Sequence, residues 1–294
     1  MRRSFIILVL GSLLLAGCNN KSTETGSTTI AVSILPQEYF VTRIAGDLFS
    51  INIMIPPGAS PATYEPTPAQ LSSLSSTSLY MKMGYTGFEM AWMEKLVSVN
   101  QEMKVVNLSG GVDLIMEGTM QDHDHAAGGH QHGGIDPHTW LSPVNAKIIS
   151  RNIHEALVAE FPEHRETFDT NLASFLSELD SLDMLIREEL EGLSSRDFFT
   201  YHPSLSYFAR DYDLVQHPLE LGGKTPSASH MKKLVDMGRS HDIGVVFLQM
   251  QFDQKNAEVL AREIDAEIVQ INPLDPEWYA QMLFIAAKLK ENLQ

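Results

Sequence analysis

Five of the 11 histidines in this chain lie within 16 residues of one another: His123, His125, His130, His132 and His138. The first four belong to a glycine-rich, polar loop, residues 122–134, that is not expected to form a helix. Imidazole and carboxylate groups in such a loop suit loose capture of a borderline metal ion such as zinc. A solvated loop with no ligand is the alternative interpretation.

His138 and His202 lie in stiffer surroundings. His138 belongs to the proline-bracketed segment Asp136–Pro143, directly before an expected helix, and His202 follows an expected strand and precedes Pro203. Ligands of open α/β sheets gather at the carboxyl ends of the strands. A single histidine of this kind is more often structural than ligating. As a pair at matching places in two halves of the chain, they are expected to chelate one ion between the halves.

The elements that carry His138 alternate between strands and helices. β-Branched runs and alternating isoleucines predict strands, and amphipathic segments bounded by proline or glycine predict helices. The expected strands cover residues 29–34, 51–55, 79–83 and 104–108, and the expected helices cover residues 36–45, a segment from 67 onward, and 87–99. Strands separated by helices indicate parallel βαβ units.

The middle of the chain is helical, and the end repeats the alternation. After a helix at residues 143–159, apolar residues recur at spacings of three and four, which predicts one helix of about 28 residues, a domain connector or a coiled-coil arm. Expected strands follow at 198–201, 244–248 and 267–271, with helices at 204–212, 225–240, 253–264 and 276–293. The sequence therefore predicts an α/β protein with two parallel-sheet lobes, residues 30–142 and 194–294, joined by helical residues 143–193.

The N-terminus has the features of an export signal. Arg2 and Arg3 precede an apolar stretch too short to span a bilayer comfortably, and the sequence Leu-Ala-Gly before Cys18 resembles a bacterial lipoprotein signal. We expect residues 1–17 to be removed, Cys18 to carry the lipid anchor, and residues 18–29 to form a flexible tether. The protein would then face the periplasm or the cell exterior. A plain signal peptide with an incidental cysteine is the alternative.

Composition and charge limit the classes of partner. The 294 residues are 44% hydrophobic and 20% charged, as in an ordinary globular protein. The formal net charge of −16 at pH 7 disfavours nucleic acid, whose phosphates need basic partners, and suits a cation. With Cys18 as the single cysteine, no internal disulfide is expected. We expect a monomer.

Several segments make the chain similar to the zinc- and manganese-binding solute receptors of bacterial ABC importers. The matching segments are residues 57–68, 136–143, 199–208, 247–252 and 272–274, and the histidine-rich loop is typical of zinc-handling members. The resemblance implies two lobes joined by a rigid helix, a metal ion between the lobes, and delivery of that ion to an ABC permease in the membrane. It places His138 and His202 at two ligand positions.

Three positions depart from the family pattern. Ala62 stands where a histidine ligand is usual, Asn272 replaces a carboxylate, and Gln249 occupies a position that is often acidic. Zinc generally takes four ligands, so water or another side chain must complete the shell. The candidates are Glu65, ranked first although it also suits a capping role, then Asp275, Glu220 and a loop histidine. Manganese prefers hard oxygen ligands, so the loss of Asp at position 272 favours zinc.

Two other functions remain open from the sequence. A metal-binding adhesion or interaction protein with a structural or degenerate site would share the same residues. A zinc hydrolase ranks last, because the chain has no His-Glu-x-x-His and no Gly-x-Ser-x-Gly motif. We therefore expect a lipid-anchored, non-enzymatic zinc receptor with His138 and His202 as its main ligands.

Overall fold

The structure is a computed structural model, and it describes residues 28–116, 134–252 and 254–294. The expected signal peptide, Cys18, most of the tether and the loop histidines His123, His125, His130 and His132 lie outside these ranges. Within the described ranges, no helix is both long enough and apolar enough to cross a bilayer.

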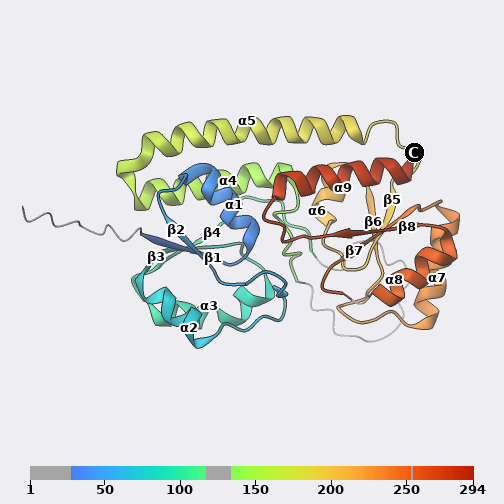
Figure 1. Cartoon of the computed structure of the whole chain (residues 1–294), viewed down its shortest axis with the longest axis horizontal. Helices are drawn as coiled ribbons and strands as arrows, with labels where there is room; N and C mark the ends of the chain where they lie inside the picture. The colour runs from blue at the N-terminus through green and yellow to red at the C-terminus, as the bar shows by residue number, and fades with distance from the viewer. Residues whose placement is uncertain (1–27, 117–133, 253) are drawn as a thin grey trace, which may run out of the picture.

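The N-terminal lobe is a four-stranded parallel sheet in the order β2-β1-β3-β4, flanked by helices (Figure 1). Its elements in chain order are β1 (Thr29–Val32), α1 (Leu35–Ala45), β2 (Ser50–Ile53), α2 (Pro68–Ser73), a 3₁₀ turn (Leu74–Ser76), β3 (Thr77–Lys82), α3 (Gly87–Val99) and β4 (Lys104–Asn107). β1 is central and completely buried except at its first residue, which explains its β-branched composition. The expected strands and helices of this half are present with small shifts of their ends.

The C-terminal lobe repeats this architecture with the strand order β6-β5-β7-β8. Its elements are β5 (Asp197–Thr200), α6 (Ser206–Asp211), β6 (Val215–Pro218), α7 (Ala228–Ser240), β7 (Val245–Gln249), α8 (Gln254–Ile264), β8 (Glu267–Ile271) and α9 (Trp278–Leu293). β6 was not expected from the sequence, because this short edge strand carries Gln216 and His217 and ends in a proline. The prediction of two parallel-sheet α/β lobes is confirmed.

Two long helices connect the lobes. α4 (Pro143–Glu160) is followed by a 3₁₀ turn (Pro162–His164) and by α5 (Arg165–Glu189), which runs along one side of both lobes in Figure 1. α5 has 25 residues, fewer than expected, because the 3₁₀ turn takes the residues after Pro162. Its apolar face is buried against α1, α4 and α9, so it is a connector and not a projecting coiled-coil arm.

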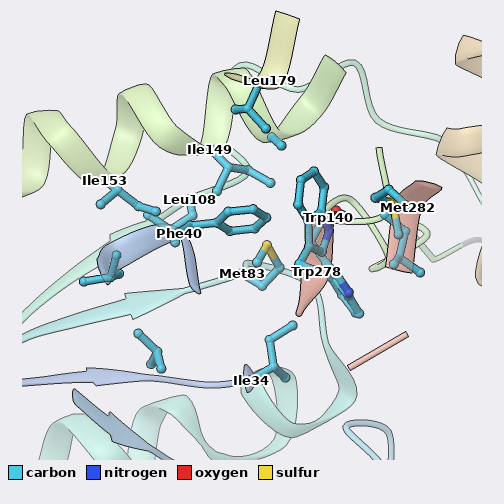
Figure 2. Close-up of a cluster of buried hydrophobic side chains, with 14 of the residues drawn as sticks. Ile34, Phe40, Met83, Leu108, Trp140, Ile149, Ile153, Leu179, Trp278 and Met282 are labelled. Atoms are coloured by element: carbon cyan, nitrogen blue, oxygen red, sulfur yellow. Dashed lines mark hydrogen bonds between the residues drawn. The ribbon is translucent and has the colours of Figure 1, made fainter. Parts of the chain in front are cut away.

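The larger of two apolar clusters extends across both lobes, and Figure 2 shows part of it. The Phe40 ring of α1 lies 4.9 Å from the Trp278 ring of α9, edge to face. Trp278 Nε1 donates to the Trp140 carbonyl at 2.8 Å, and Trp140 Nε1 donates to the Pro273 carbonyl at 2.8 Å. Both indoles are about 1% exposed. These two buried hydrogen bonds across the lobe boundary fix the position of one lobe against the other.

Replacing Trp278 by Ala is expected to lower the free energy of unfolding by about 3–5 kcal/mol, because it removes a large buried side chain and leaves the Trp140 carbonyl without its donor. Urea unfolding followed by circular dichroism measures the change. Met90→Ala is the control, since the Met90 side chain is 75% exposed and its loss should stay within about 0.5 kcal/mol. Equal effects of the two variants would contradict the proposed role of the interlobe core.

The N-terminal lobe also contains a buried carboxylate at the ends of its central strands. Glu89 accepts hydrogen bonds from the backbone of Met83 at 2.7 Å and Gly84 at 2.6 Å, and from the Ser33 hydroxyl. Burial raises the pKa of Glu89, although these hydrogen bonds and Lys82 act in the opposite direction. Glu89 therefore ties the turn after β3 to the turn after β1.

Because the pKa of Glu89 is raised, the free energy of unfolding should depend on pH. Between the ordinary glutamate pKa and the raised value, the native state holds more protons than the unfolded chain, so this group makes stability fall as pH rises. The free energy of unfolding of the native sequence, minus that of Glu89→Gln, is expected to decrease through this window. Urea titrations of both proteins at a series of pH values measure it. A difference that increases with pH would show that the hydrogen bonds outweigh burial.

Candidate metal centre

The structure brings His138 and His202 together from the two lobes. Their ring centroids are 5.1 Å apart and the rings meet edge to face, at 72°. His138 lies between β4 and α4, and His202 follows the carboxyl end of β5. The side chains are 14% and 30% exposed, so both are enclosed by protein and still reachable from solvent.

The segment that carries His138 is fixed on both sides. Ser142 Oγ accepts from the backbone of Asn145 at 3.0 Å and caps α4, with Pro143 in the first turn. The Asn145 side chain donates to the Thr139 carbonyl at 3.1 Å, and the Thr139 and Ser109 hydroxyls lie 2.8 Å apart. The backbone next to His138 is thus held by α4 on one side and by the segment after β4 on the other.

Asp136 orients the His138 ring. Its Oδ1 atom accepts from the His138 backbone at 2.9 Å and lies 2.8 Å from His138 Nδ1. Burial favours the neutral acid, but the attraction of His138 and hydrogen bonds from His138 and Ser206 outweigh it, so the pKa of Asp136 is lowered. Asp136 is therefore a carboxylate at neutral pH. The Tyr207 hydroxyl donates to the Asp136 carbonyl at 2.8 Å and links this segment to α6 of the other lobe.

Glu220 has the same relation to His202. One Glu220 oxygen is hydrogen-bonded to His202 Nδ1, and the Glu220 side chain is only 6% exposed. The Phe252 ring stacks on the other side of His202, at 5.4 Å between centroids and 23° between planes. The Glu220 backbone donates to the Tyr201 carbonyl at 3.1 Å, so the segment after β6 is held beside the segment after β5.

Gln249 holds the backbone of the His202 segment. Its Oε1 atom accepts from the His202 N–H at 3.2 Å, and its Nε2 atom donates to the His202 carbonyl at 2.8 Å and to Ser204 Oγ at 2.9 Å. A carboxylate at this position has no proton to donate to that carbonyl. The amide therefore serves a positioning role that an ionised acid does not fill.

The Asn272 side chain is also hydrogen-bonded to the backbone. Its Oδ1 atom accepts from the Leu274 N–H at 3.1 Å, and its carbonyl accepts from the Asp275 N–H at 3.0 Å, which makes a tight turn. Pro273 in this turn accepts the hydrogen bond from Trp140, whose ring lies 5.3 Å from that of His138. The turn is thus anchored beside the His138 segment by its main chain.

Ala62 and Glu65 lie in an exposed segment before α2. Pro61 accepts from the Phe88 N–H at 2.7 Å, and a Cβ atom on Gly87 would lie 2.7 Å from the Ala62 carbonyl, so this segment packs closely on the start of α3. Neither His138 nor His202 belongs to a described group of three His, Cys, Asp or Glu donors close enough to share a metal.

The described residues on either side of the histidine-rich segment are paired with each other. Met116 and Ile135 form an isolated antiparallel bridge, and Ile135 directly precedes Asp136. The four loop histidines themselves lie outside the described residues.

Together these contacts prepare two nitrogen ligands. The Asp136 carboxylate accepts hydrogen bonds only, so Nδ1 of His138 carries a proton and Nε2 keeps its lone pair in the neutral ring. His202 makes the corresponding Nδ1 hydrogen bond to Glu220. Carboxylates in this outer position fix the tautomer and raise the basicity of metal-binding histidines. Two such imidazoles suit zinc and other borderline transition ions better than manganese.

The orienting roles of Asp136 and Glu220 were not predicted from the sequence. Asp136 is two residues from His138, and this spacing is a signal that sequence reasoning can use. Glu220 was considered only as a metal ligand, because nothing in the sequence shows that the end of β6 lies beside the end of β5.

Comparisons with known proteins agree with this architecture. Residues 30–291 match the family described as zinc-uptake complex component A, periplasmic. The zinc-binding lipoprotein AdcA of Streptococcus pneumoniae (strain ATCC BAA-255 / R6) is 29% identical over 281 residues, which make up 92% of this chain and 55% of that protein. This chain thus spans about half the length of AdcA. The high-affinity zinc uptake system protein ZnuA of Bacillus subtilis (strain 168) is 30% identical over 279 residues, 90% of this chain and 85% of that protein.

Solved structures show the same relationship. A crystal structure of ZnuA has a TM-score of 0.83 at 36% identity and covers 91% of this chain and 100% of its own. A zinc-bound ZnuA deletion mutant has a TM-score of 0.82 at 36% identity and covers 91% of this chain and 98% of its own. The family match extends over both lobes and includes the two carboxylate-oriented histidines, so this chain belongs to the family of periplasmic zinc-uptake component A proteins.

Proposed function

We propose that this protein captures zinc outside the cytoplasm and delivers it to an ABC permease. The observation that carries the proposal is the pair of imidazoles, one from each lobe, each hydrogen-bonded through Nδ1 to a buried carboxylate. Capture and release need only reversible coordination, so the proposal includes no chemical step.

His138 and His202 would supply two ligands, and the rest of the shell would come from water or from a flexible acceptor such as Glu65, whose exposed position leaves it free to approach. The loop histidines His123, His125, His130 and His132 would form a second, weaker capture region, since their segment precedes His138 closely in the chain. The nitrogen ligands favour zinc over manganese.

The relatives support an exported location. AdcA is named a lipoprotein, and the family description is periplasmic. Together with the signal-like residues 1–17, these names support a lipid anchor on Cys18 and a receptor that faces the periplasm or the exterior. We propose that it acts as a monomer.

Zinc titration tests the histidine pair. His138→Ala and His202→Ala are each expected to abolish the tight zinc site, because one remaining imidazole cannot hold the ion at the lobe boundary. Competition of the metal-stripped protein with a chromophoric chelator measures the affinity. His154→Ala is the matched control, since His154 Nε2 also lies 2.6 Å from a carboxylate, that of Asp169, in a contact between α4 and α5 away from the histidine pair.

The outcomes separate the functions. Full affinity in both variants would rule out the proposed site, and zinc binding that disappears on deletion of residues 122–134 would favour an adhesion or interaction protein with a degenerate site. In a strain lacking its own zinc receptor, the native sequence should restore growth at low zinc, and the His138→Ala/His202→Ala double variant should not.

A second test concerns the orienting carboxylates. Asp136→Asn and Glu220→Gln are expected to weaken zinc binding by about 10–100-fold, because loss of the charge lowers ligand basicity and relaxes the tautomer. The same competition titration measures this change, with Asp169→Asn as the control. Unchanged affinity in both variants would assign the two carboxylates to stability alone.

A further inference from the structure

A second group of metal-type donors lies at the opposite end of the C-terminal sheet. Asp197 is the first residue of β5, His217 is in β6, and His241 directly follows α7. Among the described residues this is the one group of three His, Cys, Asp or Glu side chains whose donor atoms all lie within 4.8 Å of one another.

The two imidazoles converge on one oxygen of the Asp197 carboxylate. Asp197 Oδ1 lies 2.6 Å from His217 Nε2 and 3.1 Å from His241 Nδ1, and the two imidazole rings are 6.1 Å apart. In a tetrahedral zinc shell with ligands at about 2.0–2.1 Å, neighbouring donors lie about 3.3 Å apart. The distance from His241 Nδ1 to Asp197 Oδ1 nearly satisfies this geometry. The distance from His217 Nε2 to Asp197 Oδ1 would have to lengthen by roughly 0.7 Å for an ion to bind.

The backbone around the donors is already fixed. Ser195 Oγ donates to the His241 carbonyl at 3.3 Å and accepts from the Asp197 N–H at 3.3 Å, so one hydroxyl connects two of the three ligand residues. Parallel pairing of β5 with β6, in the register Asp197 to Val215 and Phe199 to His217, places the Asp197 and His217 side chains on the same face of the sheet. Folding of the lobe therefore assembles the group before any ion arrives.

The group is open on one side. The side chains of His217 and Asp197 are 18% and 23% exposed, whereas that of His241 is 47% exposed. Three protein donors with one side facing solvent leave a fourth position for water, as in zinc sites that are not closed by four protein ligands. Two ordinary hydrogen bonds from imidazole to a carboxylate are the competing explanation of the same distances.

We propose that Asp197, His217 and His241 form a second, solvent-facing site for a borderline divalent ion, with zinc as the best match to one carboxylate and two imidazoles. The site is separate from the His138–His202 pair. Asp197 begins β5 and His202 lies beyond its other end, so the strand alone separates them by about 10 Å, too far to share an ion. It would hold an additional ion on the outer end of one lobe, and it does not depend on the proposed receptor function.

The test uses the full chain and zinc chloride alone. The metal-stripped native sequence, His241→Ala and Asp197→Asn are titrated with zinc, and bound equivalents are counted after equilibrium dialysis. Each variant is expected to bind one equivalent fewer than the native sequence, while the tight equivalent assigned to His138 and His202 is retained. His241 is half exposed and Asn keeps the shape of Asp197, so both variants should fold, which thermal unfolding without metal verifies.

His164→Ala is the matched control, because His164 is 38% exposed and lies 3.8 Å from one acidic side chain, Glu163, without a third donor. Its zinc count should equal that of the native sequence. Crystals soaked in zinc should show an anomalous peak between Asp197, His217 and His241. An unchanged zinc count in both variants, or no peak between the three donors, would overturn the proposal and leave the group as hydrogen-bonded histidines.

Discussion

The interlobe core is the constraint on which the candidate metal centre depends. His138 and His202 belong to different lobes, and an ion bound between them needs both rings within a few tenths of an ångström of fixed positions. The two tryptophans supply this fixity, since each indole donates to a carbonyl across the boundary while its ring is buried. α5 extends this contact along the molecule by packing on α1, α4 and α9 (Figure 1). A core shared by both lobes resists a large opening motion, so small changes near the histidines are the easier route for entry of an ion.

The carboxylates at the candidate metal centre are paired with histidines. The protein is strongly acidic overall, and yet the carboxylates nearest to the two histidines, Asp136 and Glu220, are hydrogen-bonded to Nδ1 atoms. Burying each carboxylate is costly, and the cost is offset because an imidazole partner satisfies its oxygen. In return the ring is held in one tautomer with its second nitrogen available. A site with this design relies on oriented nitrogen ligands more than on a concentration of negative charge, which is consistent with preference for zinc over a harder ion.

The positions that depart from the family pattern have structural roles in this chain. Gln249 both donates to and accepts from the His202 backbone, and Asn272 closes a turn whose proline receives a hydrogen bond from Trp140. An amide can satisfy these backbone groups without adding a buried charge. Ala62 offers no donor, so its segment contributes close packing against α3 in place of a ligand.

The sequence by itself determined the fold class and the long connecting helix, because hydrophobic periodicity is a local signal. It also indicated that His138 and His202 lie at matching places in the two lobes, because the proline-bracketed segments that carry them are local signals too. It did not reveal β6, a short polar edge strand whose stability comes from pairing with β5. Only the tertiary structure decided that Glu220 lies beside His202 and that Asp197, His217 and His241 meet, since these contacts join residues from separate elements of the C-terminal lobe. The physical reason is that strand order and the packing of helices on a sheet, which depend on the whole chain, determine which side chains become neighbours.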